Sequence, residues 1–228
     1  MVPETFLRTA AVLADSASRR RRRQLKGPGD QVRVRDILSY LAAALPSHTG
    51  AAARLLAVQC ALRMNADGRV RLPIGVLRSL RLGRDLRPWS ELEQARWLRR
   101  TPALLDSESG GMAAQVLDSG LFAQHPARPD RRRAADWALR MARDGGVGAD
   151  DPTMRLTVLC LVAHTDFSVG HGCAETDRIA HECGLTPEAL IRALGRLAAS
   201  LASWSVAPDS GDLRWELPMG RPEAARPL

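Results

Sequence analysis

Residues 56–62 read Leu56-Ala57-Val58-Gln59-Cys60-Ala61-Leu62, and residues 156–162 read Leu156-Thr157-Val158-Leu159-Cys160-Leu161-Val162. The two stretches match at an offset of 100 residues. An internal repeat usually marks a duplicated structural unit. After each copy, the pattern passes through a glycine-containing loop, a short helix, a turn and a second helix. The sequence therefore predicts two units of the same kind.

The composition predicts a mainly α fold. Of the 228 residues, 45% are hydrophobic and only 4% are aromatic, and the abundant Ala, Leu and Arg favour helix. The longest apolar runs are too short to span a bilayer, and the amino end lacks the pattern of a secretion signal. Four cysteines without a C-x-x-C spacing indicate a reduced compartment. We therefore expect a cytoplasmic protein with no membrane partner.

The charge is distributed unevenly along the chain. The net charge is +5 for residues 1–50, +7 for 51–100, −1 for 101–150 and −3 for 151–228, which gives the total of +8. Such an asymmetry indicates nucleic-acid contact on the basic side. Lys26 is the only lysine, and this codon bias is typical of a GC-rich bacterial genome of the actinobacterial kind.

The first half is predicted to be helical over residues 5–25, 34–45, 51–64, 74–82 and 85–95. Gly27-Pro28-Gly29 is expected to stop the first helix, and Gly83 to make the turn before the last. Residues 96–99 and 113–117 are expected to pair as strands.

The second half is predicted to contain helices over 131–143, 153–164 and 176–183, with a linker at 144–148. A further helix is expected to start at Pro187, with Thr186 as its cap. Residues 201–206 and 213–217 alternate like the two strands of a hairpin.

A family resemblance lies in these turn regions. Residues 154–217 resemble the winged helix-turn-helix domains of bacterial regulators and plasmid replication initiators through Ile179-Ala180-His181-Glu182-Cys183-Gly184-Leu185-Thr186-Pro187 and Ala193-Leu194-Gly195-Arg196-Leu197. Residues 52–100 resemble the same domain through Pro88-Trp89-Ser90-Glu91-Leu92-Glu93-Gln94-Ala95-Arg96-Trp97-Leu98. The resemblance implies two winged-helix units with small β-hairpin wings and an amino-terminal basic helical segment.

The expected organisation follows from this resemblance. Residues 1–50 hold the amino-terminal helices with the arginine run, 51–130 the first unit, 131–149 a connecting helix and linker, 150–220 the second unit and 221–228 a tail.

In this family the second helix of the turn enters the major groove, while the wing and flanking arms contact phosphates. The resemblance therefore implies that the first unit contacts DNA through Arg71, Arg78, Arg81, Arg84, Arg87, Ser90, Glu91 and Gln94. Positions 78, 81, 84 and 87 fall three apart, which concentrates positive charge around the turn. The alternative is a solvated arginine face without a ligand.

The corresponding surface of the second unit consists of Thr186, Glu188, Ile191, Arg192, Gly195 and Arg196, of which Thr186, Arg192 and Arg196 are the expected DNA contacts. The acidic charge of this unit disfavours contact with phosphates. Two uses are therefore open: contact with DNA, or formation of a homodimer or docking of a partner protein. The basic run Arg19, Arg20, Arg21, Arg22 and Arg23 is expected to bind phosphates or the minor groove, or else to be a solvated helix end.

Candidate zinc ligands fall within one stretch of the chain: Cys160, His164, His171, Cys173, His181 and Cys183. Buried free cysteines explain the pattern more simply, so no metal or other cofactor is expected. His181-Glu182 lacks a second histidine four residues on, and no phosphate-binding loop or nucleophile elbow is present. We therefore expect no enzymatic activity.

The function expected from the sequence is binding of double-stranded DNA, carried mainly by the first unit and the arginine run, in a nucleoid-associated transcriptional regulator. A plasmid or mobile-element replication initiator is one alternative. A winged-helix module that docks proteins without binding DNA is the other.

Overall fold

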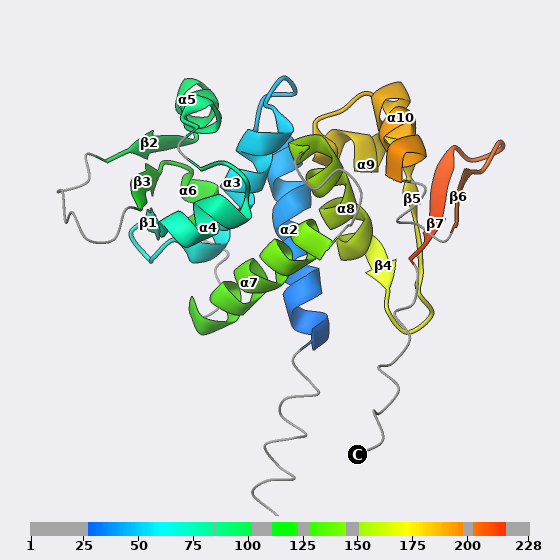
Figure 1. The fold of residues 1–228 in the computed structure, drawn as a ribbon, viewed down its shortest axis with the longest axis horizontal. Coiled ribbons are helices and arrows are strands. Elements are labelled where there is room, and N and C mark those ends of the chain that lie inside the picture. Colours follow the sequence, from blue (N-terminus) through cyan, green and yellow to red (C-terminus); the bar gives the residue numbers. More distant parts are fainter. Residues whose placement is uncertain are drawn as a thin grey trace, which may run out of the picture.

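The computed structural model describes residues 27–83, 85–101, 111–122, 128–144, 151–197 and 203–217. Helices predominate, and two small antiparallel sheets lie at opposite ends of the molecule (Figure 1). The helical majority agrees with the composition. The strands go beyond the two expected hairpins, because each sheet contains additional strands near its leading helix.

The first half contains α2 (Gly27–Ala44), α3 (Ala51–Arg63), β1 (Arg69–Leu72), α4 (Ile74–Ser79), α5 (Arg87–Gln94), β2 (Leu98–Arg100) and β3 (Met112–Val116). The short α6 (Ser119–Phe122) and the long α7 (Arg128–Asp144) follow. The second half contains α8 (Pro152–His164), β4 (Thr165–Asp166), β5 (His171–Glu175), α9 (Thr176–Cys183), α10 (Pro187–Leu197), β6 (Ser203–Val206) and β7 (Asp212–Glu216).

The two halves repeat one order of elements: two long helices, one strand in the first half (β1) or two in the second (β4 and β5), two shorter helices and a two-stranded hairpin. In each sheet the last strand lies in the middle, because the orders are β1-β3-β2 and β4-β5-β7-β6. The hairpin strands pair as the sequence predicts, with Leu98 opposite Val116 and Trp204 opposite Trp215. The strands β1, β4 and β5 were not predicted.

Most helix predictions are confirmed to within a few residues, and α9 agrees at both ends. The start of α10 is also confirmed, since the helix begins at Pro187 and the Thr186 hydroxyl accepts a hydrogen bond from Ala189 N at 3.2 Å. The helix predicted over residues 5–25, including its end, lies outside the described residues. Gly27-Pro28-Gly29 open α2, which begins earlier than the predicted start at residue 34, because proline suits the first turn and the helix dipole favours the acidic Asp30 there.

One hydrophobic core joins the two halves. The leading helices α3 and α8 pack against each other, and α2 and α7 each contact both of them. Residues 55–62 of α3 and 156–163 of α8 are buried along their whole lengths. The stretches that carry the sequence repeat therefore form the centre of the molecule.

Two buried arginines connect the halves in a reciprocal way. Arg54 and Arg155 are each the fourth residue of a leading helix, so the helices correspond at an offset of 101 rather than 100. Arg155 donates to the carbonyl of Ser79, at the end of α4 in the other half, and to Ala142 O at 3.2 Å.

Arg54 contacts the other half by packing. It donates to Thr49 O and Pro46 O of its own half, both at 3.1 Å, and lies against Gly184, the turn residue that ends α9 in the other half. A Cβ atom on Gly184 would stand 2.5 Å from Arg54 Nε. Each leading helix therefore fixes the turn between the short helices of the other half.

Candidate nucleic-acid interface

The turn between α4 and α5 is compact and places α5 on the surface. Arg81 and Gly83 both take positive φ, at 59° and 53°, and Leu82 N donates to Leu77 O at 2.9 Å. Trp89 and Leu92 anchor the inner face of α5 in the core. The outer face is left to solvent.

Several of the predicted contact residues gather here, and we call them the turn surface. It consists of Arg78, Arg81, Arg87, Ser90 and Gln94. The three arginines and Gln94 are exposed, whereas Ser90 is half-buried. Arg84 and Arg19–Arg23 lie outside the described residues.

One cation of the turn surface is partly neutralised within it. The Arg87 guanidinium pairs with the Asp85 carboxylate at 2.8 Å, and its side chain is 87% exposed. The hydrogen bonds from Arg87 hold the pKa of Asp85 below its usual value. Asp85 therefore stays charged at neutral pH and orients Arg87 at the start of α5.

The two glutamates of α5 have structural partners. The Glu91 carboxylate accepts a hydrogen bond from Gly50 N at 2.8 Å, at the start of α3. Glu93 pairs with Arg100 of β2 at 2.6 Å. Glu91 was expected on the DNA-facing side, and this bond instead ties α5 to the leading helix.

The first sheet carries a second basic surface, which we call the sheet surface. Along β1 the exposed Arg69 and Arg71 alternate with the buried Val70 and Leu72. Gln115 of β3 lies between Arg69 and Arg99 in the strand register. A row of polar side chains therefore crosses the outer face of the sheet.

A hollow of about 420 Å³ deepens this face, and Arg63 and Arg132 also line it. No carboxylate is among its described lining residues. Only Arg71 was predicted here. The Arg-Val-Arg-Leu alternation of residues 69–72 is the pattern of a half-buried strand, and it could have identified Arg69.

The predicted DNA-contact residues of the second unit take part in contacts within the fold. Thr186 caps α10, and Arg196 pairs with Asp151 at 2.7 Å, beside the start of α8. Arg192 is exposed and lies near the Glu188 carboxylate. All three therefore have polar neighbours within the second half.

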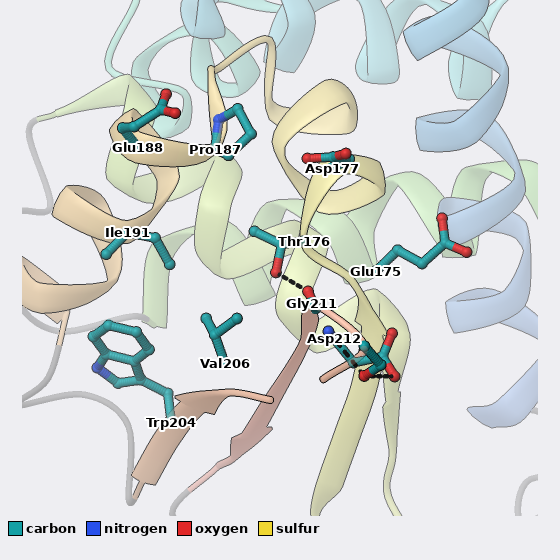
Figure 2. A pocket seen from close by; sticks show the side chains of 11 residues that line it. Glu175, Thr176, Asp177, Pro187, Glu188, Ile191, Trp204, Val206, Gly211 and Asp212 are labelled. Atoms are coloured by element: carbon teal, nitrogen blue, oxygen red, sulfur yellow. Dashed lines mark hydrogen bonds between the residues drawn. The ribbon is translucent and has the colours of Figure 1, made fainter. Parts of the chain in front are cut away.

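A groove lies between α9, α10 and the β6–β7 hairpin, and we call it the acidic groove (Figure 2). Its carboxylates are Glu175, Asp177, Glu188 and Asp212. Its apolar residues include Ile191, Trp204 and Val206. In the corresponding hollow of the first half, between α4, α5 and β3, the charged residues among those described are Arg78 and Asp85. The same place in the two halves therefore differs in charge.

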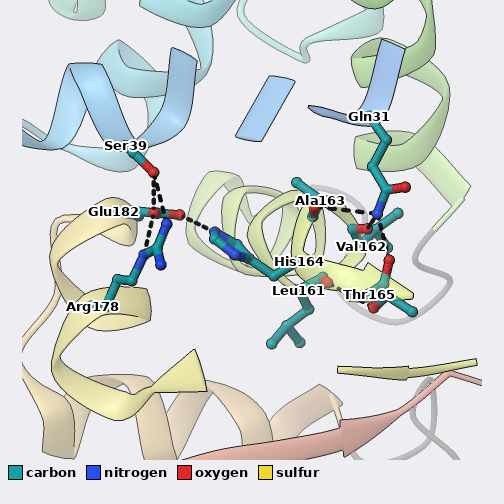
Figure 3. Close-up of polar contacts among 9 residues, drawn as sticks. All are labelled: Gln31, Ser39, Leu161, Val162, Ala163, His164, Thr165, Arg178 and Glu182. Atoms are coloured by element: carbon teal, nitrogen blue, oxygen red, sulfur yellow. Dashed lines mark hydrogen bonds and ion pairs between the residues drawn. The ribbon is translucent and has the colours of Figure 1, made fainter. Parts of the chain in front are cut away.

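A polar network holds α2 to the second half (Figure 3). Glu182 accepts a hydrogen bond from Ser39 at 2.7 Å and pairs with His164 at 2.8 Å and Arg178 at 3.4 Å. Burial alone would raise the pKa of Glu182, but these bonds and charges outweigh it and hold the pKa below its usual value. Gln31 donates to the carbonyls of Val162, Ala163 and Thr165.

The candidate zinc ligands do not converge on one point. Cys160 and Cys183 are buried side by side, and the hydrogen bond between them, together with burial, raises the pKa of Cys160. His164 pairs with Glu182, and Cys173 is exposed. Within the described ranges, no three His, Cys, Asp or Glu side chains are placed to hold a metal ion.

No helix in the described part of the chain has both the length and the apolar character needed to cross a membrane. Comparisons of the chain with models of protein families, with curated proteins and with solved structures find no match.

Proposed function

We propose that the chain is a double-stranded DNA-binding protein with two winged helix-turn-helix units, and that it regulates transcription. The repeated order of helices and strands supports the winged-helix assignment, as does the central position of the last strand in each sheet. In such units the second short helix lies in the major groove and the hairpin beside it contacts phosphates. These parts are α5 and β2–β3 in the first half.

The observation that carries the proposal is the charge difference between equivalent places in the two halves. The first half exposes Arg78, Arg81 and Arg87 around α5, and its sheet adds further arginines. The second half presents carboxylates at the corresponding position. DNA phosphates attract the first surface and are repelled by the second. We therefore assign DNA contact to the first half.

The test uses the full chain and a set of random-sequence duplexes, with binding measured by fluorescence anisotropy between 50 and about 300 mM salt, a range over which phosphate contacts lose most of their strength. The variant Arg78→Gln with Arg87→Gln should weaken binding and flatten the salt dependence by about one to two in log–log slope. Arg140→Gln, an exposed arginine of α7, is the matched control. Binding by the parent chain that is absent or independent of salt would overturn the proposal.

The regulatory role has its own test. Chromatin mapping of the full chain in its host should find bound sites at promoters. Clustered repeats beside a replication origin would instead identify a replication initiator.

A further inference from the structure

We infer that the DNA held by α5 continues across the sheet surface to the hollow beside the start of α7, and that it does not extend to α10. The inference rests on the proposed function and names the path that the DNA backbone takes over the protein.

The hollow of the sheet surface gathers positive charge from three elements. Arg69 and Arg71 come from β1, Arg63 ends α3, and Arg132 lies near the start of α7. No aromatic side chain is among the described residues that line the hollow. It therefore offers cations to a phosphate but no ring on which a base could stack, which is the character of a backbone contact.

The charge of the hollow is only partly balanced. The Asp136 carboxylate pairs with Arg63 at 2.5 Å, and Asp67 lies beside the hollow, where it accepts a hydrogen bond from Asn65 at 3.3 Å. In the part of the chain that the structure describes, no carboxylate pairs with the exposed Arg69 or Arg132. A bound phosphate would supply the missing negative charge and accept hydrogen bonds from both guanidinium groups.

The walls of the hollow are fixed before any ligand binds. Gln115 of β3 donates to Asp67 O at 2.6 Å, which ties the sheet to the loop after α3. The buried Arg131 donates to Met64 O at 2.9 Å, which holds the start of α7 against the end of α3. Arg132 therefore keeps its position relative to β1 without help from a ligand.

A row of polar side chains leads from α5 to the hollow. Helix α5 packs against β2 at one edge of the sheet, and β1 forms the other edge. Arg99, Gln115 and Arg69 stand in one row across β2, β3 and β1. Two strand spacings amount to about 10 Å, which is within the width of about 12 Å of the DNA major groove. The backbone that borders the groove holding α5 can therefore lie along this row.

The opposite direction is unfavourable for phosphates. Helix α10 lies toward the other end of the molecule from the first sheet (Figure 1). Glu188 in its first turn and Asp177 of α9 line the acidic groove beside it. Arg196 of α10 is already engaged by Asp151 at 2.7 Å. The charges of the two halves therefore direct the DNA from α5 toward α7.

The first test maps the path with an iron chelate that is tethered to a cysteine and cleaves nearby DNA. One full-length variant carries Thr101→Cys, at the exposed edge of the hollow, and the other carries Gly195→Cys, on the exposed face of α10. Both also carry Cys173→Ser, because Cys173 is exposed, whereas Cys60, Cys160 and Cys183 are buried. We expect strand cleavage from the first position and none above background from the second. Equal melting temperatures of the labelled proteins exclude unfolding as the cause.

The second test measures the contribution of the hollow to affinity. Arg132→Gln should reduce the slope of log affinity against log salt by about one, and should weaken duplex binding about five-fold near 100 mM salt. Arg140→Gln, an exposed arginine farther along the same helix, should leave the affinity and the slope unchanged.

Two results would overturn the path while the parent chain still binds DNA in a salt-dependent way. They are cleavage from Gly195→Cys that equals or exceeds that from Thr101→Cys, and an Arg132→Gln variant that binds DNA like the parent. If this variant binds DNA normally but loses binding of inorganic tripolyphosphate, the hollow takes a free oligophosphate and the inference is wrong. Absence of DNA binding by the parent chain would instead overturn the proposed function, and the path with it.

Discussion

Gly172 lies flat against the indole ring of Trp215, its partner across the β5–β7 pair. A Cβ atom on Gly172 would stand 2.1 Å from the ring, and Trp215 cannot move away because it is buried and donates to the Thr165 hydroxyl at 2.9 Å. The second sheet therefore depends on a glycine at this position.

We expect Gly172→Ala to lower the free energy of unfolding by about 3 kcal/mol, because the added methyl group overpacks the core. Gly195→Ala is the matched control, since Gly195 lies within α10 with open space where its Cβ would be. That change should raise stability by about 0.5–1 kcal/mol through helix propensity. Urea denaturation of both variants measures the difference, and equal effects would contradict the packing argument.

Arg155→Met should destabilise the chain by about 3 kcal/mol, because the carbonyls of Ser79 and Ala142 lose a buried charged donor. Arg54→Met should have a similar effect through Thr49 and Pro46. Arg140→Met, on the exposed face of α7, should change the free energy of unfolding by less than about 0.5 kcal/mol. Thermal unfolding of the three variants checks the ranking. If Arg155→Met unfolds like the parent chain, the reciprocal contacts do not stabilise the fold.

The Glu182 network predicts an acid-sensitive fold. The pKa of Glu182 in the folded chain is below its ordinary value of 4.5. The stabilisation that Glu182 contributes is therefore complete above pH 4.5 and is lost as the pH falls through the folded pKa. In Glu182→Gln, the decline of stability below pH 4.5 should be shallower than in the parent chain. Asp209→Asn, in the exposed hairpin turn, should keep the parent's slope. Denaturation curves between pH 3 and about pH 7 measure both.

If the sheet surface contacts DNA, its arginines should contribute to the salt dependence of binding. Arg69→Gln with Arg99→Gln should reduce the slope of log affinity against log salt by about two, if each guanidinium neutralises one phosphate. Arg192→Gln, on the second half, should leave the slope unchanged. Anisotropy titrations of the full chain at several salt concentrations give both slopes. An unaltered slope in the double variant would place the sheet surface outside the DNA interface.

The sequence was sufficient where local chemistry determines local structure. Thr186 and Pro187 predict the start of α10 because a hydroxyl cap and a proline at the first position are both local effects. The hairpins were likewise predicted from alternation. The strand β1 was missed because four residues give a short periodic pattern, and its pairing depends on β3, whose paired residues lie 40 to 46 positions further along the chain.

The burial of Arg54 and Arg155 could not be predicted from the sequence. Residue type alone places arginine at the surface, yet Arg54 is 1% exposed and Arg155 is 3% exposed. Arg155 is buried against carbonyls of Ser79 and Ala142, which come from elsewhere in the chain, whereas Arg54 is buried against the preceding turn at Pro46 and Thr49. No periodic pattern in the sequence reveals either contact. The positive charge of the first half predicts a candidate DNA surface. The sequence did not show that Glu91 and Glu93 bind other parts of the fold, because their partners depend on the folded structure.

The shared core has a consequence for how the chain works at low abundance. Two separate subunits associate only above a concentration set by their dissociation constant. Here the two halves are joined covalently and exchange contacts through Arg54 and Arg155, so dilution cannot part them. The spacing of α5 and α10 is therefore the same at a few copies per cell as at thousands.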